Sequence, residues 1–153
     1  MKRLLLASLL ISISFLNMGL VEKPKLEALV CAEKEKLKKM SFKQKWDPYK
    51  NFNFSYDKKT GKLYWYYESL NEINPVKKLK VLNNIYTYKG KIENNTLKVV
   101  MSLKTRYNKW PDLIFLVDLN EMQNTSFFVN TPDKKKYLPC EKLSFPKGIK
   151  INY

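Results

Sequence analysis

The stretch FNFSYDKKTGKLYWYYESL, from Phe52 to Leu70, decides the fold of this chain. It holds two short aromatic runs around a Lys-Lys-Thr-Gly turn, in which Gly61 can supply the positive φ that a tight reversal needs. If Asp57 faces Lys62, large side chains of the two runs pair across one face, because side chains alternate along a strand. These pairs are Tyr56 with Leu63, Phe54 with Trp65 and Phe52 with Tyr67. The stretch therefore predicts a β-hairpin with one apolar face.

The opposite face of this hairpin is predicted to meet water. It carries Asn53, Ser55, Tyr64, Tyr66 and Glu68, which makes it amphipathic. A register shift of one residue would move the large rings into solvent, so the register is well specified. An isolated hairpin is at best marginally stable in water. We therefore expect other segments of the chain to add strands to it.

The chain after the hairpin carries further strand patterns separated by turn signals. Residues 97–103 alternate between apolar and polar side chains, and residues 113–119 are apolar on both faces except for Asp118. Pro139 predicts that the last strand, residues 136–143, lies at a sheet edge, because proline cannot donate to a ladder. The patterns together predict an all-β, mainly antiparallel fold, a small sandwich or barrel of about seven or eight strands.

The N-terminus has the features of a secretory signal peptide: a basic MKR start is followed by a mostly apolar run over residues 4–16. We predict a signal peptide over residues 1–28, cut after Ala28 or alternatively after Ala32. The run is shorter than the ~20 residues of a membrane span, although an uncleaved anchor is the other alternative. The predicted mature protein is periplasmic or secreted, with no transmembrane span. A short helical or extended arm, residues 29–50, precedes a single β-domain over residues 51–153.

The chain has two cysteines, Cys31 and Cys140, which stand near the two ends of the predicted mature protein. In an exported protein such a pair predicts a disulfide rather than a reactive site. The bridge requires that processing stops before Cys31. A cut after Ala32 would leave Cys140 as a lone thiol.

The chain is strongly basic, with 29 Lys and Arg residues, 14 Asp and Glu residues and a formal net charge of +15. Its arginines are Arg3, within the predicted signal peptide, and Arg106. Sequence-specific nucleic-acid binding is disfavoured, because arginine is the usual residue for bidentate recognition of bases and phosphates. The charge predicts adhesion to anionic lipid, polysaccharide or nucleic acid at low salt. An A/T-rich coding sequence would also produce a chain rich in Lys, Asn, Ile, Tyr and Phe, so the charge has a second explanation.

The sequence contains no histidine, which excludes Ser-His-Asp and Cys-His catalysis and most zinc sites. Its four glycines are scattered, and no phosphate-binding loop is present. We therefore predict no metal, no cofactor and no enzymatic activity. Hydrolysis by paired carboxylates is the enzyme class that needs no histidine. Its candidates are Glu68, Glu72, Glu93, Asp112, Asp118 and Glu121. Asp118 also fits a strand end that is hydrogen-bonded to the following turn.

Aromatic side chains interleaved with basic ones are candidate platforms for stacking on sugars or bases. The candidate binding residues are Tyr64 and Tyr66 on the hairpin, and Arg106, Lys109 and Trp110 in a later loop. We expect a non-catalytic binding or interaction module whose partner is an anionic or glycan surface or a protein. The alternatives are a barrel that carries an apolar ligand and a carboxylate-dependent hydrolase. A cavity of several hundred Å³ would favour the carrier, and two carboxylates converging in a cleft would favour the hydrolase.

Overall fold

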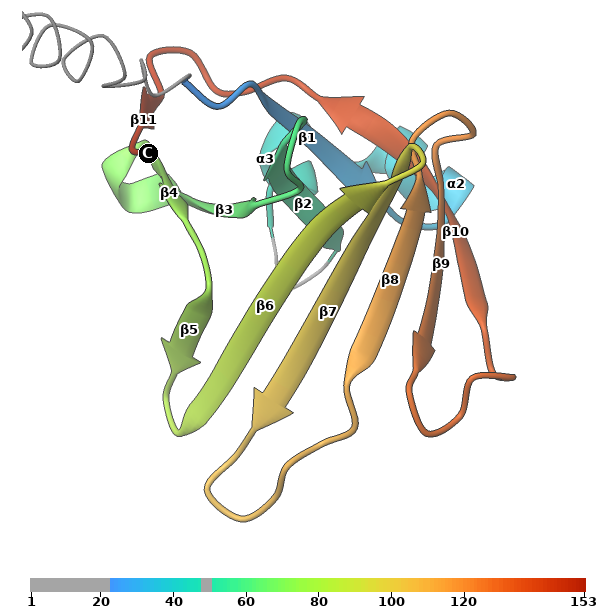
Figure 1. Ribbon diagram of the computed structural model, residues 1–153. Coiled ribbons are helices and arrows are strands. Elements are labelled where there is room, and N and C mark those ends of the chain that lie inside the picture. Colours follow the sequence, from blue (N-terminus) through green and yellow to red (C-terminus); the bar gives the residue numbers. More distant parts are fainter. Residues whose placement is uncertain (1–22, 48–50) are drawn as a thin grey trace, which may run out of the picture.

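The computed structural model describes residues 23–47 and 51–153. Within them, eleven strands form one sheet in the order β11-β4-β3-β2-β1-β10-β9-β8-β7-β6-β5 (Figure 1). Neighbouring strands are antiparallel except β11 and β4, which are parallel. The prediction of a mainly antiparallel all-β fold is confirmed. The sheet is not closed, however, and a sandwich or barrel of seven or eight strands is not confirmed.

The strands are β1 (Leu26–Cys31), β2 (Phe52–Asp57), β3 (Leu63–Tyr67), β4 (Glu72–Pro75), β5 (Lys78–Val81), β6 (Asn84–Glu93), β7 (Thr96–Lys104), β8 (Leu113–Asp118), β9 (Gln123–Phe128), β10 (Lys136–Leu143) and β11 (Lys150–Ile151). Two short helices, α2 (Lys34–Lys39) and α3 (Phe42–Lys45), follow β1, and a 3-10 turn, η1 (Glu68–Leu70), follows β3. None of the helices in the described part of the chain is long and apolar enough to cross a membrane.

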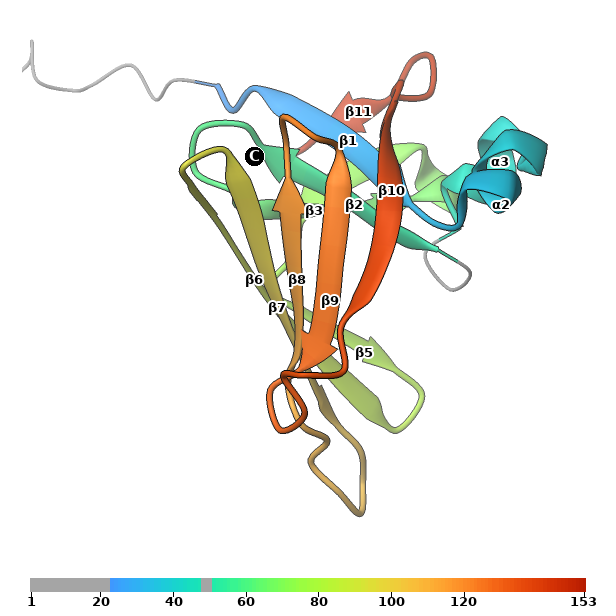
Figure 2. The same ribbon diagram turned by 90° about the vertical axis from the view of Figure 1, so that its right-hand side faces the viewer.

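The sheet bends so that its two halves enclose one core. Strands β1 to β3 run across the upper ends of β6 to β9 (Figures 1 and 2). The contact is close where the β2–β3 turn meets β6: a Cβ added to Gly90 would lie 2.2 Å from the carbonyl oxygen of Gly61. Gly61 itself has a φ of +76°. The core between the halves consists of Leu29, Cys31, Tyr56, Leu63, Val76, Leu97, Val99, Phe115, Val117, Leu138 and Cys140.

The predicted register of the first hairpin is confirmed next to its turn; the β2–β3 ladder ends at Ser55 and Tyr64, so it does not include the predicted pairs Phe54 with Trp65 and Phe52 with Tyr67. Tyr56 lies opposite Leu63, and the Asp57 N–H donates to the Lys62 carbonyl oxygen at 2.9 Å. The large rings of this face turn toward the core, as predicted: Phe52, Phe54 and Trp65 all pack against it. The rings of Phe52 and Phe54 lie 4.9 and 5.3 Å from the ring of Phe115 on β8.

The prediction that the other face of the hairpin meets water is wrong for its tyrosines. Tyr64 is only 4% exposed, and the ring of Tyr66 packs edge-on against Trp46 at 5.1 Å. The cause is the segment between β1 and β2, which folds back as α2 and α3 over this face. A second core results there, built from Ala28, Val30, Ala32, Leu37, Trp46 and Leu143 with Met40, Tyr66 and Phe145 packed against it.

The prediction that the last strand lies at a sheet edge is also wrong, because β10 lies between β9 and β1. Pro139 is tolerated in this interior strand because it faces Ala32, one residue beyond the end of β1. The Ala32 N–H donates to the Pro139 carbonyl oxygen at 3.2 Å. The nitrogen of Pro139, which cannot donate, therefore faces a position where the ladder has already ended.

Strand β1 lies at the two predicted cleavage sites of the signal peptide. The predicted signal peptide falls largely on residues 1–22, outside the described residues, and it stays a prediction. A cut after Ala28 would divide β1, and a cut after Ala32 would remove it together with Cys31. Because β1 pairs with both β2 and β10 and is largely buried, a product with the whole strand requires a cut before Leu26.

Glu27 links β1 to its two neighbouring strands. Its carboxylate accepts a hydrogen bond from the Tyr56 hydroxyl at 3.0 Å and lies 3.1 Å from the Lys58 ammonium and 3.9 Å from that of Lys142. Burial alone would raise the pKa of Glu27, but the hydrogen bonds from Lys58 and Tyr56 and the charges of both lysines lower it below its ordinary value. Burial and the bond to Glu27 raise the pKa of Tyr56.

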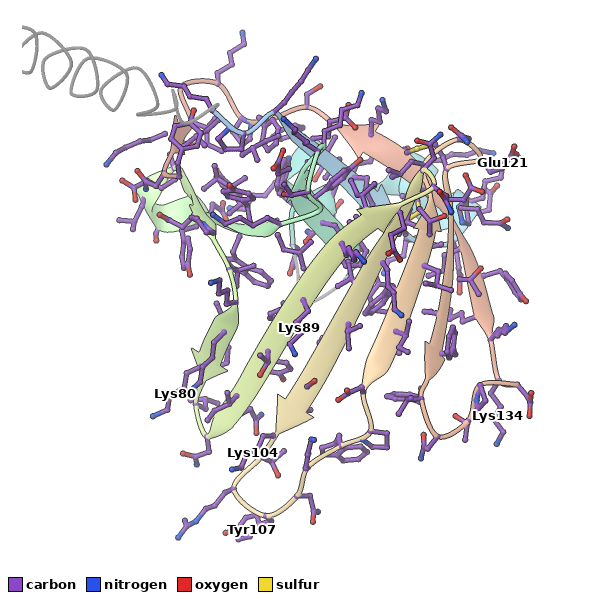
Figure 3. The ribbon with its side chains drawn as sticks, in the orientation of Figure 1. Lys80, Lys89, Lys104, Tyr107, Glu121 and Lys134 are labelled. Carbon is purple, nitrogen blue, oxygen red and sulfur yellow. A yellow bond between two sulfur atoms is a disulfide. The ribbon has the colours of Figure 1, made fainter. Side chains whose placement is uncertain are left out.

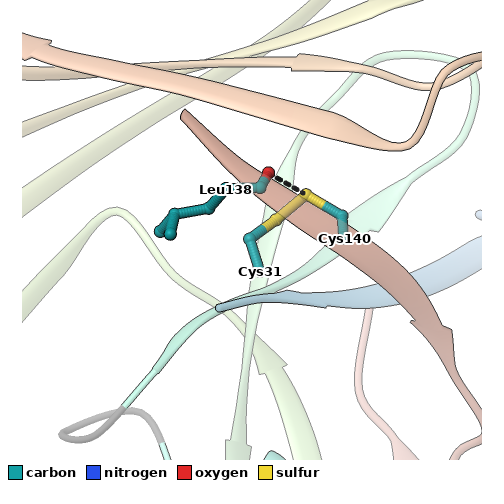
Figure 4. The surroundings of a disulfide bond; sticks show 3 residues. All are labelled: Cys31, Leu138 and Cys140. Carbon is teal, nitrogen blue, oxygen red and sulfur yellow. Dashed lines mark hydrogen bonds between the residues drawn. A yellow bond between two sulfur atoms is a disulfide. The ribbon is translucent and has the colours of Figure 1, made fainter. Parts of the chain in front are cut away.

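The predicted disulfide between Cys31 and Cys140 is confirmed (Figure 4). The two residues lie directly opposite each other in the β1–β10 ladder, and both are buried. The Cys140 sulfur also lies 3.8 Å from the carbonyl oxygen of Leu138. Such a bridge is consistent with an extracellular location, where disulfides persist.

Candidate ligand groove

A surface groove of about 760 Å³ lies between α3, the end of β3 and η1. This volume falls within the range of small-molecule sites, roughly 300–1,000 Å³. The residues that line it are Ser41, Phe42, Lys43, Gln44, Trp46, Asp47, Trp65, Tyr66, Tyr67, Glu68, Ser69 and Pro146. Five of them are aromatic, and most of the others can form hydrogen bonds.

Helix α3 places two of the aromatic rings. The helix is held at its start by a capping box, in which Ser41 Oγ accepts from the Gln44 N–H at 3.3 Å and Gln44 Oε1 accepts from the Ser41 N–H at 2.8 Å. Phe42 and Trp46 are four residues apart, so they lie on one side of the helix. Trp46 is 8% exposed and packs on Tyr66, whereas Phe42 is half exposed. The groove therefore has an anchored ring at its base and an accessible ring at its wall.

Strand β3 and the turn after it supply the opposite wall. Trp65, Tyr66 and Tyr67 follow one another at the end of the strand, and all three line the groove, but the Trp65 ring itself packs in the first core, 6.1 Å from the ring of Tyr88. The Tyr66 hydroxyl donates to Asn71 Oδ1 at 3.2 Å, which fixes the ring. Asn71 adopts a left-handed conformation with a φ of 50°, which ends η1 and returns the chain to the sheet. These contacts hold the aromatic wall in place.

An ion pair joins the two walls. The Lys43 ammonium on α3 lies 2.8 Å from Glu68 Oε1 on η1. Its hydrogen bond to Glu68 raises the pKa of Lys43. Asp47 is the second carboxylate in the lining. The groove thus holds one basic and two acidic side chains, in contrast to the net charge of +15 of the whole chain.

The indole of Trp46 has an unsatisfied donor. Its Nε1 is buried and has no hydrogen-bond acceptor among the described residues. Trp46 also lines a small cavity of about 20 Å³ beneath the groove, together with Asn53, Ser55, Tyr64, Trp65 and Tyr66. This cavity is large enough for one water molecule.

The structure divides the predicted binding residues into two groups. Tyr66 lines the groove, and Tyr64 is buried beside the small cavity. Arg106, Lys109 and Trp110 are exposed on the β7–β8 loop, at the end of the molecule where Figure 3 labels Tyr107. The two groups lie in different parts of the fold, so they do not form one site.

Sequence reasoning missed the contribution of α3. The signals were present, because Ser41 and Gln44 have capping-box spacing and Phe42 and Trp46 have helical spacing. What could not be foreseen is that this helix packs against the back of β3.

The predicted carboxylate candidates are mostly occupied elsewhere. Glu72 pairs with a lysine of β11, and Glu93 with a lysine of its own strand. Asp118 accepts from the Asn120 N–H at 2.8 Å, which places it in the strand-end role that the sequence also allowed. Glu68 is the candidate that lines the groove. Within residues 23–47 and 51–153, no cluster of three or more metal-ligating side chains occurs.

Comparison of this chain with family models, with curated proteins and with solved structures finds no match. Its function must therefore be inferred from its own residues.

Proposed function

We propose that this protein is a non-catalytic glycan-binding module, and that a short, uncharged oligosaccharide occupies the groove beside α3. The observation that carries the proposal is the composition of the groove, whose lining combines aromatic residues, among them the half-exposed Phe42, with hydrogen-bonding side chains. The C–H-rich face of a sugar ring packs on an aromatic ring, and its hydroxyl groups need donors and acceptors nearby. Both requirements are met along one groove.

The position and charge of the groove favour a sugar over the other ligand classes. An apolar carrier encloses its ligand, whereas Ser41, Phe42, Lys43 and Gln44 line this groove and are exposed. A polyanion would meet the carboxylates of Asp47 and Glu68 here. An uncharged, hydroxyl-rich ligand fits the balance of rings and polar groups best.

The proposal is tested by titrating the purified protein with uncharged hexose and N-acetylhexosamine oligosaccharides, using calorimetry or NMR. The informative variant is Phe42→Ala, because this ring is half exposed and lies outside both cores. We expect the variant to bind about tenfold more weakly, which corresponds to losing roughly 1.4 kcal/mol of stacking. Tyr107→Ala is the matched control, since it removes an exposed ring far from the groove.

Two results would contradict the proposal. One is the absence of binding to every oligosaccharide tested at millimolar concentration. The other is binding that Phe42→Ala and Tyr107→Ala weaken to the same extent, because the ligand would then not depend on the groove.

The second candidate is a carboxylate-dependent glycoside hydrolase, because Asp47 and Glu68 both line the groove. Such an enzyme needs one carboxylic acid as a proton donor and a second carboxylate as nucleophile or base. The Glu68 carboxylate lies 2.8 Å from the Lys43 ammonium. Release of reducing ends from a bound oligosaccharide, lost in Glu68→Gln and in Asp47→Asn while binding persists, would assign the groove to catalysis.

A further inference from the structure

Three connections of the sheet lie together at the end of the molecule away from α3. They are the β5–β6 turn, the β7–β8 loop and the β9–β10 loop, which share one end because β5 to β10 form an antiparallel meander (Figures 1 and 2). Residues 80–83, 104–112 and 128–136 make up this region, which we name the loop end.

The loop end is strongly basic, with seven basic and two acidic side chains. They are Lys80, Lys104, Arg106, Lys109, Lys134, Lys135 and Lys136, with Asp112 and Asp133. Figure 3 labels Lys80, Lys104 and Lys134 among them. In the described part of the chain, none of these basic side chains forms an ion pair. Lys104 and Lys109 even face each other across an antiparallel bridge, where like charges repel. The charge of the loop end is thus left for an external anion.

The same region exposes large apolar side chains. Leu82 is 87% exposed, Tyr107 83% and Trp110 53%. Phe128 and Val129 are exposed beside them, so the loop end carries five of the nine large hydrophobic side chains exposed in the described residues. Single exposed apolar residues are common on protein surfaces, but their concentration at one basic end calls for an explanation.

Leu82 is placed against its own conformational preference. Its φ is 54°, in the left-handed region that a bulky residue rarely adopts. Asparagine tolerates this conformation better than leucine. Two asparagines, Asn83 and Asn84, follow directly in the same turn. A leucine here gains neither burial nor a favourable backbone, which points to a role for its side chain outside the folded core.

The β7–β8 loop holds its rings outward through its own hydrogen bonds. The Thr105 hydroxyl oxygen accepts from the N–H groups of Tyr107 and Asn108 at 3.3 and 2.9 Å. The Trp110 N–H donates to the Leu103 carbonyl oxygen at 2.9 Å. The guanidinium of Arg106 lies 5.6 Å from the centre of the Tyr107 ring. Rings and charges are therefore presented together by an ordered loop.

We propose that the loop end docks the protein on an anionic lipid bilayer. Lysine side chains contact the lipid headgroups, and Leu82, Tyr107 and Trp110 enter the interface between headgroups and acyl chains. Tyrosine and tryptophan are the residues that favour this interface, and a basic surface with apolar side chains is the pattern of proteins that lie on membranes. A soluble polyanion would neutralise the lysines but would leave Leu82 and Val129 in water, so the apolar tips favour a lipid surface.

The test is co-sedimentation of the exported protein with vesicles of phosphatidylcholine alone and of an equimolar mixture of phosphatidylcholine and phosphatidylglycerol. We expect binding to the anionic vesicles only, and a blue shift of tryptophan fluorescence that Trp110→Phe abolishes. The double variant Lys134→Glu/Lys135→Glu should bind at least about 25-fold more weakly at low salt, since each basic residue near the surface contributes about fivefold and the added carboxylates are repelled. Leu82→Asn keeps the charge and should bind about fivefold more weakly through its lost apolar contact.

The control is Lys89→Glu/Lys98→Glu, which makes the same charge change on exposed strand residues outside the loop end. Figure 3 labels Lys89. It should change binding by no more than about twofold. The proposal is overturned if the protein binds both vesicle types equally or neither, or if it is retained by heparin but not by anionic vesicles. It is also overturned if the control weakens binding as much as Lys134→Glu/Lys135→Glu while Leu82→Asn has no effect. Phe42→Ala should bind vesicles normally, which separates this surface from the groove.

Discussion

Reduction of the Cys31–Cys140 disulfide should remove a large share of the stability of this protein. The bridge joins residues 109 positions apart in the chain. In the chain-entropy model, closing a loop of about 100 residues stabilises the folded state by about 4.7 kcal/mol, because it restricts the unfolded chain. Domains of this kind have unfolding free energies of roughly 5–15 kcal/mol. The reduced protein is therefore expected to keep at most about two thirds of that free energy of unfolding.

The measurement is urea unfolding of the oxidised protein, of the reduced protein and of Cys31→Ala/Cys140→Ala, followed by tryptophan fluorescence. Trp46 and Trp65 report on the two cores. The oxidised and reduced proteins contain nearly the same atoms, so their difference isolates the cross-link from packing. We expect that difference to be about 4–5 kcal/mol. The alanine variant should lose somewhat more, because two buried sulfur atoms are also removed.

A difference below about 1 kcal/mol between the oxidised and reduced proteins would refute this reasoning. It would mean that the unfolded chain already keeps the two cysteines close, or that β1 and β10 hold together without the bridge. The slope of the unfolding free energy against urea distinguishes the two, since a compact unfolded state lowers that slope.

Further expectations concern single positions. Asn124 is fully buried, and neither polar atom of its side chain has a partner among the described residues. Asn124→Leu should therefore raise the free energy of unfolding by about 1–3 kcal/mol in the same urea assay. A loss of stability would show that the side-chain amide of Asn124 is satisfied. Gly90→Ala places a Cβ 2.2 Å from the carbonyl oxygen of Gly61 and should lower the free energy of unfolding by about 1–3 kcal/mol. An unchanged urea midpoint would mean that the two halves of the sheet do not touch at Gly90. The lowered pKa of Glu27 contributes stability that is present above its ordinary value of 4.5 and is lost as the pH falls. Glu27→Gln should therefore be less stable than the native protein at pH 7 and equal to it in strong acid; a difference that is constant with pH would contradict this. The intact mass of the purified protein should include Leu26, and a product that starts after Ala28 would show that β1 is dispensable.

Local patterns carried much of the prediction. Alternation and Gly61 specify the register of the first hairpin, because both act within a few residues of the turn. Asp118 was recognised as a strand-end residue for the same reason. The disulfide followed from the count of cysteines and the expected export, without knowledge of the fold.

Contacts between distant segments decided the rest. Residues 26–31 follow an apolar N-terminal run and resemble its continuation, yet they form an interior strand because β2 and β10 pair with them from either side. Pro139 predicts an edge strand, but β10 is interior. The proline is accepted there because β1 ends one residue before Ala32, the residue that faces Pro139. Tyr66 became part of a groove because α3 packs behind β3. Alternation determines which side chains share a face of a strand, but the segment that covers that face is chosen by tertiary packing.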